Sequence, residues 1–284
     1  MEHDGNRAMN QSAASGDESQ ARNRPRMTAQ TVDIVSADAA PSPAGPWKFW
    51  GTVLWSIAIL AVMMVVGAGS TFAALLWLNP DPNLSVQQLH DLILSKTVLL
   101  SATFAAATVS GLAVLALAVR LSRLSAKDYL GLMLPQRRDV LTGLAALAAL
   151  YLIFAVVTHF VSPNATDWFS TSYRSARDTG MLPALAAMII IFAPVGEELI
   201  VRGFMLRGWA ASRLGPTTAI VLTSMLWTVL HTQYEVLALA YVFSIGLLFG
   251  WLRQRTGSTV LTMMLHATQN GVALIQIALT AWLS

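Results

Sequence analysis

The sequence predicts an all-α membrane protein: a polytopic bundle of about seven transmembrane helices that follows a disordered N-terminal tail. Hydrophobic residues make up 55% of the 284 residues and charged residues 12%, which is about half the charge of a soluble domain. Several apolar runs also reach the roughly 20 residues that a membrane-spanning helix needs. We therefore expect the lipid bilayer to surround this chain, and we expect no nucleic acid among its partners.

Residues 1–46 differ in composition from the rest of the chain. They are rich in Ser, Ala, Asn, Asp and Arg, and the stretch closes with Pro41, Pro43 and Pro46. Such a segment buries too little apolar surface to offset the entropy lost on ordering. We expect a disordered cytoplasmic tail over residues 1–46 and a transmembrane helical domain over residues 47–284.

Seven apolar runs follow the tail and give the expected helices in order. They are residues 50–78, 97–119, 140–161, 183 to about 207, 217–230, 236–252 and 260–283. The fifth and sixth runs are short, and residues 231–235 separate them. These two runs either cross the membrane as a tight hairpin or form a partly re-entrant pair.

Basic residues gather in alternate loops, and this pattern predicts the orientation in the membrane. The even-numbered loops hold Arg120, Arg123, Lys127, Arg137, Arg138, Arg207, Arg213, Arg253 and Arg255, whereas the odd-numbered loops hold Lys96, Arg174 and Arg177. Cytoplasmic loops carry the excess of Lys and Arg. We expect a multi-pass protein of the inner or plasma membrane with a cytoplasmic N-terminus.

Two adjacent glutamates lie in the fourth apolar run, in the sequence Glu197-Glu198-Leu-Ile-Val-Arg202. On a helix, Glu198 and Arg202 can pair on one face, whereas Glu197 points about 100° away and stays free. A charged group at membrane depth costs roughly 2.5 to 3.5 kcal/mol by insertion scales, so such residues mark a protein-lined cavity. The alternative is an ion-pair network that serves packing alone.

Two further pairs of polar side chains lie in the later runs. Trp227 and His231 are four residues apart near the end of the fifth run, and His266 and Asn270 are four apart in the last run. Imidazole and carboxamide groups supply a base and hydrogen-bond donors. Taken alone, each pair also fits a structural role, at an interface or as a hydrogen bond between helices.

The three motifs together resemble a known family. Their order, Glu-Glu-x-x-x-Arg, aromatic-x-x-x-His and His-x-x-x-Asn over residues 182–284, is similar to that of the CAAX prenyl protease and bacteriocin-processing family of intramembrane endopeptidases, also called the Abi family. Asp128-Tyr-Leu-Gly131 upstream is similar too. Trp227 stands where the family usually has phenylalanine. The resemblance implies hydrolysis of a peptide bond in a membrane-associated protein or peptide, with residues 182–284 as catalytic core.

The resemblance also implies roles for these residues. The catalytic set would be Glu197, His231, His266 and Asn270, with Glu198, Arg202 and Trp227 in structural or tuning roles. Glu197 would act as general base on a water that His231 orients. His266 and Asn270 would stabilise the oxyanion. We expect the site to open toward the cytoplasmic half of the bundle.

The sequence leaves alternatives open for the cofactor and for the class of function. Glu197, His231 and His266 are ligand types that zinc accepts, so the cofactor is either none or zinc. The family has been described both as metalloproteases and as metal-independent glutamate proteases. A non-catalytic protein of the same fold, with a bacteriocin-immunity or scaffold role, is one rival. A proton-coupled transporter is another, although no inverted halves are evident. The oligomeric state is not predicted.

Overall fold

The computed structural model describes residues 47–283 apart from residues 87, 90–91, 93–95 and 162–167. The expected disordered tail over residues 1–46 lies outside the described residues. Within the described part of the chain the secondary structure is entirely helical, which confirms the predicted fold class.

Each of the seven apolar runs forms a helix. The first part of the chain contains α1 (Phe49–Leu78), α3 (Thr97–Leu121), α4 (Ala126–Leu130), α5 (Arg137–Val161) and α6 (Trp168–Asp178). The second part contains α7 (Leu182–Ala187), η1 (Met188–Phe192), α8 (Ala193–Glu198), η2 (Leu199–Met205), α9 (Leu206–Ala210), α10 (Gly215–Val229), α11 (Val236–Thr256) and α12 (Thr259–Leu283). The elements from α7 to α9 follow one another without a break and form one span of 29 residues.

Five of the described helices are long and apolar enough to cross a membrane: Phe49–Leu78, Leu99–Leu121, Arg137–Val161, Leu182–Ala210 and Val236–Thr256. The chain is therefore an integral membrane protein, but the expected count of about seven spans is not confirmed. The helix α10 has 15 residues and a length of about 22 Å, which is less than the roughly 30 Å of the hydrocarbon core. The helix α12 is long enough, but polar residues interrupt it.

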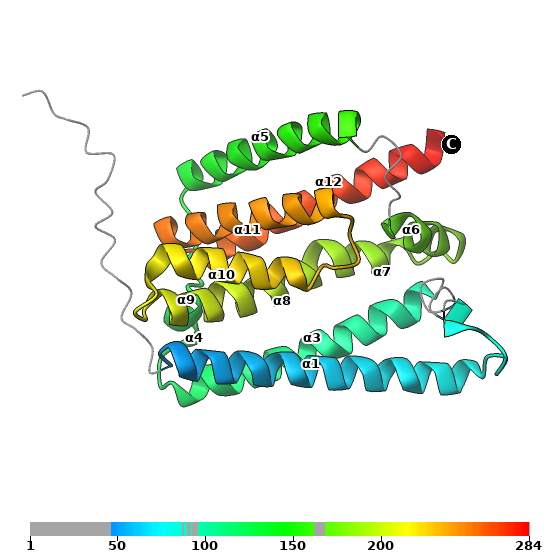
Figure 1. Cartoon of the computed structure of the whole chain (residues 1–284), viewed down its shortest axis with the longest axis horizontal. Coiled ribbons are helices and arrows are strands. Elements are labelled where there is room, and N and C mark those ends of the chain that lie inside the picture. The colour runs from blue at the N-terminus through cyan, green and yellow to red at the C-terminus, as the bar shows by residue number, and fades with distance from the viewer. Residues whose placement is uncertain (1–46, 87, 90–91, 93–95, 162–167, 284) are drawn as a thin grey trace, which may run out of the picture. The chain divides into compact units, whose positions relative to one another are not determined.

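The span Leu182–Ala210 lies at the centre of the helix packing. In its most apolar stretch 44% of the residues are buried in the protein, against 6% in α1. Its segments contact α3, α10, α11 and α12, and Figure 1 shows α8 among these helices. The two glutamates lie in α8, so the fold carries them into the interior of the bundle rather than to its lipid-facing surface.

Close helix contacts around this span depend on two glycines. A Cβ on Gly196 would lie 2.6 Å from a side-chain carbon of Thr108 on α3, and a Cβ on Gly246 would lie 2.9 Å from the Cβ of Ser224 on α10. Small residues allow helix backbones to approach one another in membranes. The first glycine brings α8 against α3, and the second closes the hairpin of α10 and α11.

Polar contacts tie α4 to one end of the bundle. Arg207 on α9 donates a hydrogen bond to the backbone carbonyl of Asp128, and Thr259 donates to the carbonyl of Leu130 at 2.5 Å. Burial raises the pKa of Tyr129 to about 12, although the Arg207 guanidinium opposes this effect. The Asp128-Tyr-Leu-Gly motif thus holds α4 against α9 and against the start of α12.

Candidate active site

Glu198 and Arg202 form the ion pair that their spacing predicts. Arg202 Nη1 donates to Glu198 Oε1 at 3.0 Å, and the two side chains are 1% and 0% exposed. The guanidinium also lies over the Trp227 ring, 4.5 Å from its centroid. Because both side chains are buried, removal of either charge leaves the other buried without its counter-ion.

His266 is the second partner of Glu198. Its Nδ1 lies 3.1 Å from the same Oε1 atom that Arg202 contacts. A carboxylate can only accept a hydrogen bond, so Nδ1 carries the proton. The other ring nitrogen, Nε2, is then a lone-pair acceptor in the neutral ring and a donor in the imidazolium. The sequence predicted His266 as a site residue but did not predict this contact.

As predicted, Glu197 does not pair with Arg202. Its carboxylate has another partner instead. Its Oε2 accepts a hydrogen bond of 2.6 Å from the indole nitrogen of Trp227. The family that this sequence resembles usually has phenylalanine in place of Trp227, and phenylalanine has no such donor. The substitution that separates this chain from the family pattern therefore supplies a direct contact to the expected general base.

His231 lies two residues after the end of α10 and packs between two aromatic rings. Its Nδ1 lies 2.8 Å from the backbone carbonyl of Trp227, so this nitrogen is the donor. Nε2 of the neutral ring is then an acceptor. The ring stacks on Tyr234, with centroids 5.9 Å apart and planes at 17°. These contacts fix the ring in one tautomer and one orientation, which suits a group that binds a water.

Asn270 lies one turn beyond His266 on α12 and anchors the start of the central span. Its Nδ2 donates to the backbone carbonyl of Ile189 at 2.8 Å. Ile189 belongs to η1, a π-helical segment, and such segments often occur at functional sites. Since a carboxamide has two N–H groups, the second N–H of Asn270 is left for another acceptor.

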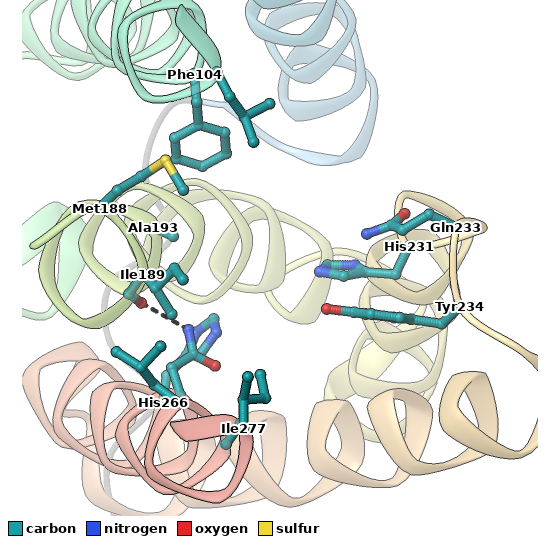
Figure 2. A pocket seen from close by; sticks show the side chains of 13 residues that line it. Phe104, Met188, Ile189, Ala193, His231, Gln233, Tyr234, His266 and Ile277 are labelled. Atoms are coloured by element: carbon teal, nitrogen blue, oxygen red, sulfur yellow. Dashed lines mark hydrogen bonds between the residues drawn. The ribbon is translucent and has the colours of Figure 1, made fainter. Parts of the chain in front are cut away.

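A cavity of about 210 Å³ lies beside these residues, and Figure 2 shows its side chains. It is lined by Leu100, Phe104, Met188, Ile189, Ala193, His231, Gln233, Tyr234, His266, Asn270, Ala273, Leu274 and Ile277. Three of the expected catalytic residues therefore share one cavity. Glu197 is not among the lining residues. It lies one helical turn after Ala193 on α8, so its side chain projects from the same face as this wall residue.

Sequence reasoning missed two polar residues of the cavity. Gln233 and Tyr234 belong to the short connection between α10 and α11 and line the cavity next to His231. The available signal was their position, since a turn of polar residues between two short apolar runs is itself unusual at membrane depth.

We expected the site to open toward the basic loops, but the cavity extends away from them. Its residues on α12 follow His266 and lie farther along the helix from Thr259, the first residue of α12. Thr259 itself lies next to the basic residues that end α11. The structure therefore directs the cavity toward the opposite end of the bundle.

The zinc hypothesis finds no matching ligand set in this arrangement. Among the described residues, no three His, Asp or Glu side chains lie close enough together to hold a metal ion. Each candidate uses one atom for a hydrogen bond, namely Glu197 Oε2 with the Trp227 indole, His231 Nδ1 with the Trp227 carbonyl and His266 Nδ1 with the Glu198 carboxylate. The residues as placed do not fit a zinc centre, and no step below uses one.

Comparisons with known proteins identify the same region of the chain. Residues 179–272 match the family model described as "Type II CAAX prenyl endopeptidase Rce1-like", which confirms the family resemblance. A stretch of 90 residues, 31% of the chain, is 36% identical to an "Uncharacterized 24.3 kDa protein" of Escherichia coli. The match spans about two fifths, 41%, of that relative's length. No solved structure matches the chain.

Proposed function

We propose that this protein, with its Rce1-like domain at residues 179–272, is an intramembrane endopeptidase. It would hydrolyse a peptide bond in a membrane-associated protein or peptide. The observation that carries the proposal is the cavity that His231, His266 and Asn270 share, with Glu197 one helical turn after the wall residue Ala193 on α8. A base, an acceptor for water and two donors are what hydrolysis of an amide requires.

In the proposed first step, Glu197 and His231 activate water. The Trp227 indole holds Oε2 of Glu197, so Oε1 is the oxygen that takes a proton from water. Nε2 of His231 accepts the water's other hydrogen and fixes its position. The resulting hydroxide attacks the carbonyl carbon of the scissile bond. When the carbon–nitrogen bond breaks, Glu197 returns its proton to the leaving nitrogen.

His266 and Asn270 would stabilise the negative oxygen that forms during this attack. Asn270 contributes its second N–H. His266 contributes Nε2, and it can donate from this atom only as the imidazolium, because Nδ1 already gives its proton to Glu198. Donors that are held in place in a water-poor cavity stabilise such a charge far better than water does.

With His266 in its imidazolium form, the buried charges of the site would balance. Glu197 and Glu198 carry two negative charges, while Arg202 and the imidazolium of His266 carry two positive charges. Glu198 lies between Arg202 and His266, so the four charges of the set sum to zero. A balanced set lowers the cost of holding ionised groups away from water.

The two rival functions explain fewer of these contacts. A scaffold or immunity protein has no need for donors and a carboxylate beside one small cavity. A proton-coupled transporter needs a relay that continues to both faces, whereas the contacts of Glu197, Glu198 and Arg202 run to Trp227 and to His266 at the cavity. The proposal needs no cofactor beyond the protein's own residues and assigns the bilayer and one peptide substrate as partners.

A comparison of protein termini in membranes tests the proposal. Cells that produce the wild-type protein are compared with cells that produce Glu197→Gln, and new protein termini are identified by mass spectrometry. The matched control is Glu235→Gln, an identical change at an exposed glutamate outside the cavity lining. We expect a set of cleavages that the wild type and the control share and that Glu197→Gln lacks. Identical termini in all three would contradict an endopeptidase function.

A further inference from the structure

The residues that line the cavity show toward which end of the bundle it extends. On α12, Ala273, Leu274 and Ile277 line the cavity beyond His266. At 1.5 Å per residue, Ile277 is about 16 Å farther from the start of the helix than His266 is. The cavity therefore extends along α12 away from Thr259, the residue that follows the basic end of α11.

The other walls of the cavity agree with this direction. On α3, Leu100 and Phe104 line it within the first two turns, whereas Arg120 lies in the last turn. In the central span, Met188 and Ile189 line the cavity upstream of α8, and the chain runs from there toward the basic end. The connection with Gln233 and Tyr234 closes the hairpin of α10 and α11 at the end opposite to Arg213 and Arg255.

Figure 1 shows the same separation within the helical part. The starts of α1 and α10 and the short α4 lie at one end, and α6 and the end of α12 lie at the other. The loops at the first end hold most of the basic residues, whereas Arg174 and Arg177 lie in α6. Because excess Lys and Arg marks the cytoplasmic side, the cavity lies toward the extracytoplasmic side.

The lining also defines the chemistry of the substrate. Most of its side chains are apolar, and His231, Gln233, Tyr234, His266 and Asn270 are its polar members. None of the lining residues is a lysine, arginine or carboxylate. A charged side chain that packed against the apolar members of this lining would lose its hydration without gaining an opposite charge. The segment that binds here is therefore uncharged and mainly apolar.

We propose that the cavity admits substrate from the extracytoplasmic half of the membrane. The substrate would be an uncharged, membrane-inserted peptide segment whose scissile bond lies in that leaflet. The location of the cavity opening follows from the fold and the charge pattern, while its use by a peptide rests on the proposed endopeptidase function. Figure 2 shows His231 and Tyr234 on one side of the cavity and His266 on another.

The chain has no cysteine, so single cysteines report accessibility without background. Gln233→Cys places a thiol at the exposed rim of the cavity, and Gln254→Cys places one on the exposed last turn of α11 at the basic end. Thr232→Cys and Arg255→Cys are second, exposed positions at the two ends. Intact cells receive a membrane-impermeant maleimide, and detergent-solubilised protein gives the total reactive thiol.

We expect the thiols at residues 232 and 233 to react in intact cells, and those at residues 254 and 255 to react only after the membrane is opened. The reverse pattern would place the cavity on the cytoplasmic side and overturn the proposal. Equal reactivity at both ends in intact cells would show that the two ends do not lie on opposite sides, which would also overturn it.

A second readout separates this proposal from the proposed function. In intact cells that carry Gln233→Cys, a bulky impermeant maleimide is expected to lower the Glu197-dependent cleavages at least tenfold relative to the same cells without the reagent. Complete labelling with unchanged cleavage would show that substrate does not pass this rim. If no Glu197-dependent cleavage exists, the endopeptidase function fails, whereas the accessibility result still decides where the cavity opens.

Discussion

The indole nitrogen of Trp227 lies 2.6 Å from Glu197 Oε2, and this hydrogen bond joins the two halves of the candidate site. Trp227 also packs edge-on against His231 and His266, with ring centroids 5.1 and 5.5 Å away. The guanidinium of Arg202 lies over its ring. A single aromatic residue thus contacts the expected base, both histidines and the buried arginine.

Trp227→Phe is expected to lower kcat by about 10-fold to 100-fold with little change in KM. The phenyl ring keeps the aromatic contacts but removes the donor to Glu197, and a hydrogen bond to a charged group is worth about 1.5 to 3 kcal/mol. Kinetics on a peptide found in the membrane comparison would measure this. Trp227→Leu is the control, since it removes the ring as well and should also lower thermal stability. Wild-type kcat in Trp227→Phe would show that the indole bond does not position Glu197.

Glu198→Gln is expected to lower thermal stability in detergent as well as activity. The amide leaves the buried charge of Arg202 without its counter-ion, and the loss of one partner of a buried pair costs about 3 to 5 kcal/mol. The double variant Glu198→Gln with Arg202→Met removes both charges and should recover part of the lost stability. An unchanged melting temperature in the single variant would argue against a stabilising pair.

His266→Ala and Asn270→Ala should each lower kcat far more than they raise KM. Donors to the oxyanion act mainly in the transition state, and the loss of one such donor costs on the order of 100-fold to 1,000-fold in rate. Steady-state kinetics on the purified variants would separate the two parameters. A large rise in KM with kcat nearly unchanged would assign these residues to ground-state binding instead.

Removal of metal is expected to leave activity intact. Within the residues that the structure describes, the zinc candidates do not form a group of three ligands that could hold a metal ion, so prolonged dialysis against a strong chelator should not affect turnover. Metal analysis should find well below about one equivalent per chain. Stoichiometric zinc that is lost and restored together with activity would require a rearranged site. A non-chelating isomer of an apolar chelator controls for simple occupation of the cavity.

Contacts within one helix could be predicted from sequence spacing, whereas contacts between helices could not. The four-residue spacing gave the Glu198–Arg202 pair and the shared cavity face of His266 and Asn270. The bonds of His266 to Glu198 and of Trp227 to Glu197 depend on how far each helix is rotated and how deep it lies. Packing decides both, and no local pattern encodes them.

The membrane-spanning helices could likewise be predicted only in part. Apolar runs correctly located the helices, including the short α10, but the π-helical turns at either end of α8 did not follow from composition. The relative depth of the two histidines also did not follow from the sequence. Trp227, one turn before His231, contacts His266, so His231 lies only about one turn farther from the basic end.

Hydrolysis of a defined peptide by purified protein in water labelled with the heavy oxygen isotope tests the central claim most directly. The wild type should release a product whose new carboxyl group contains one labelled oxygen, because water supplies the nucleophile. Glu197→Gln should fold, insert and melt like the wild type but release no product, since an amide of the same size cannot take the proton. A Glu197→Gln variant that retains half or more of wild-type turnover would contradict the account.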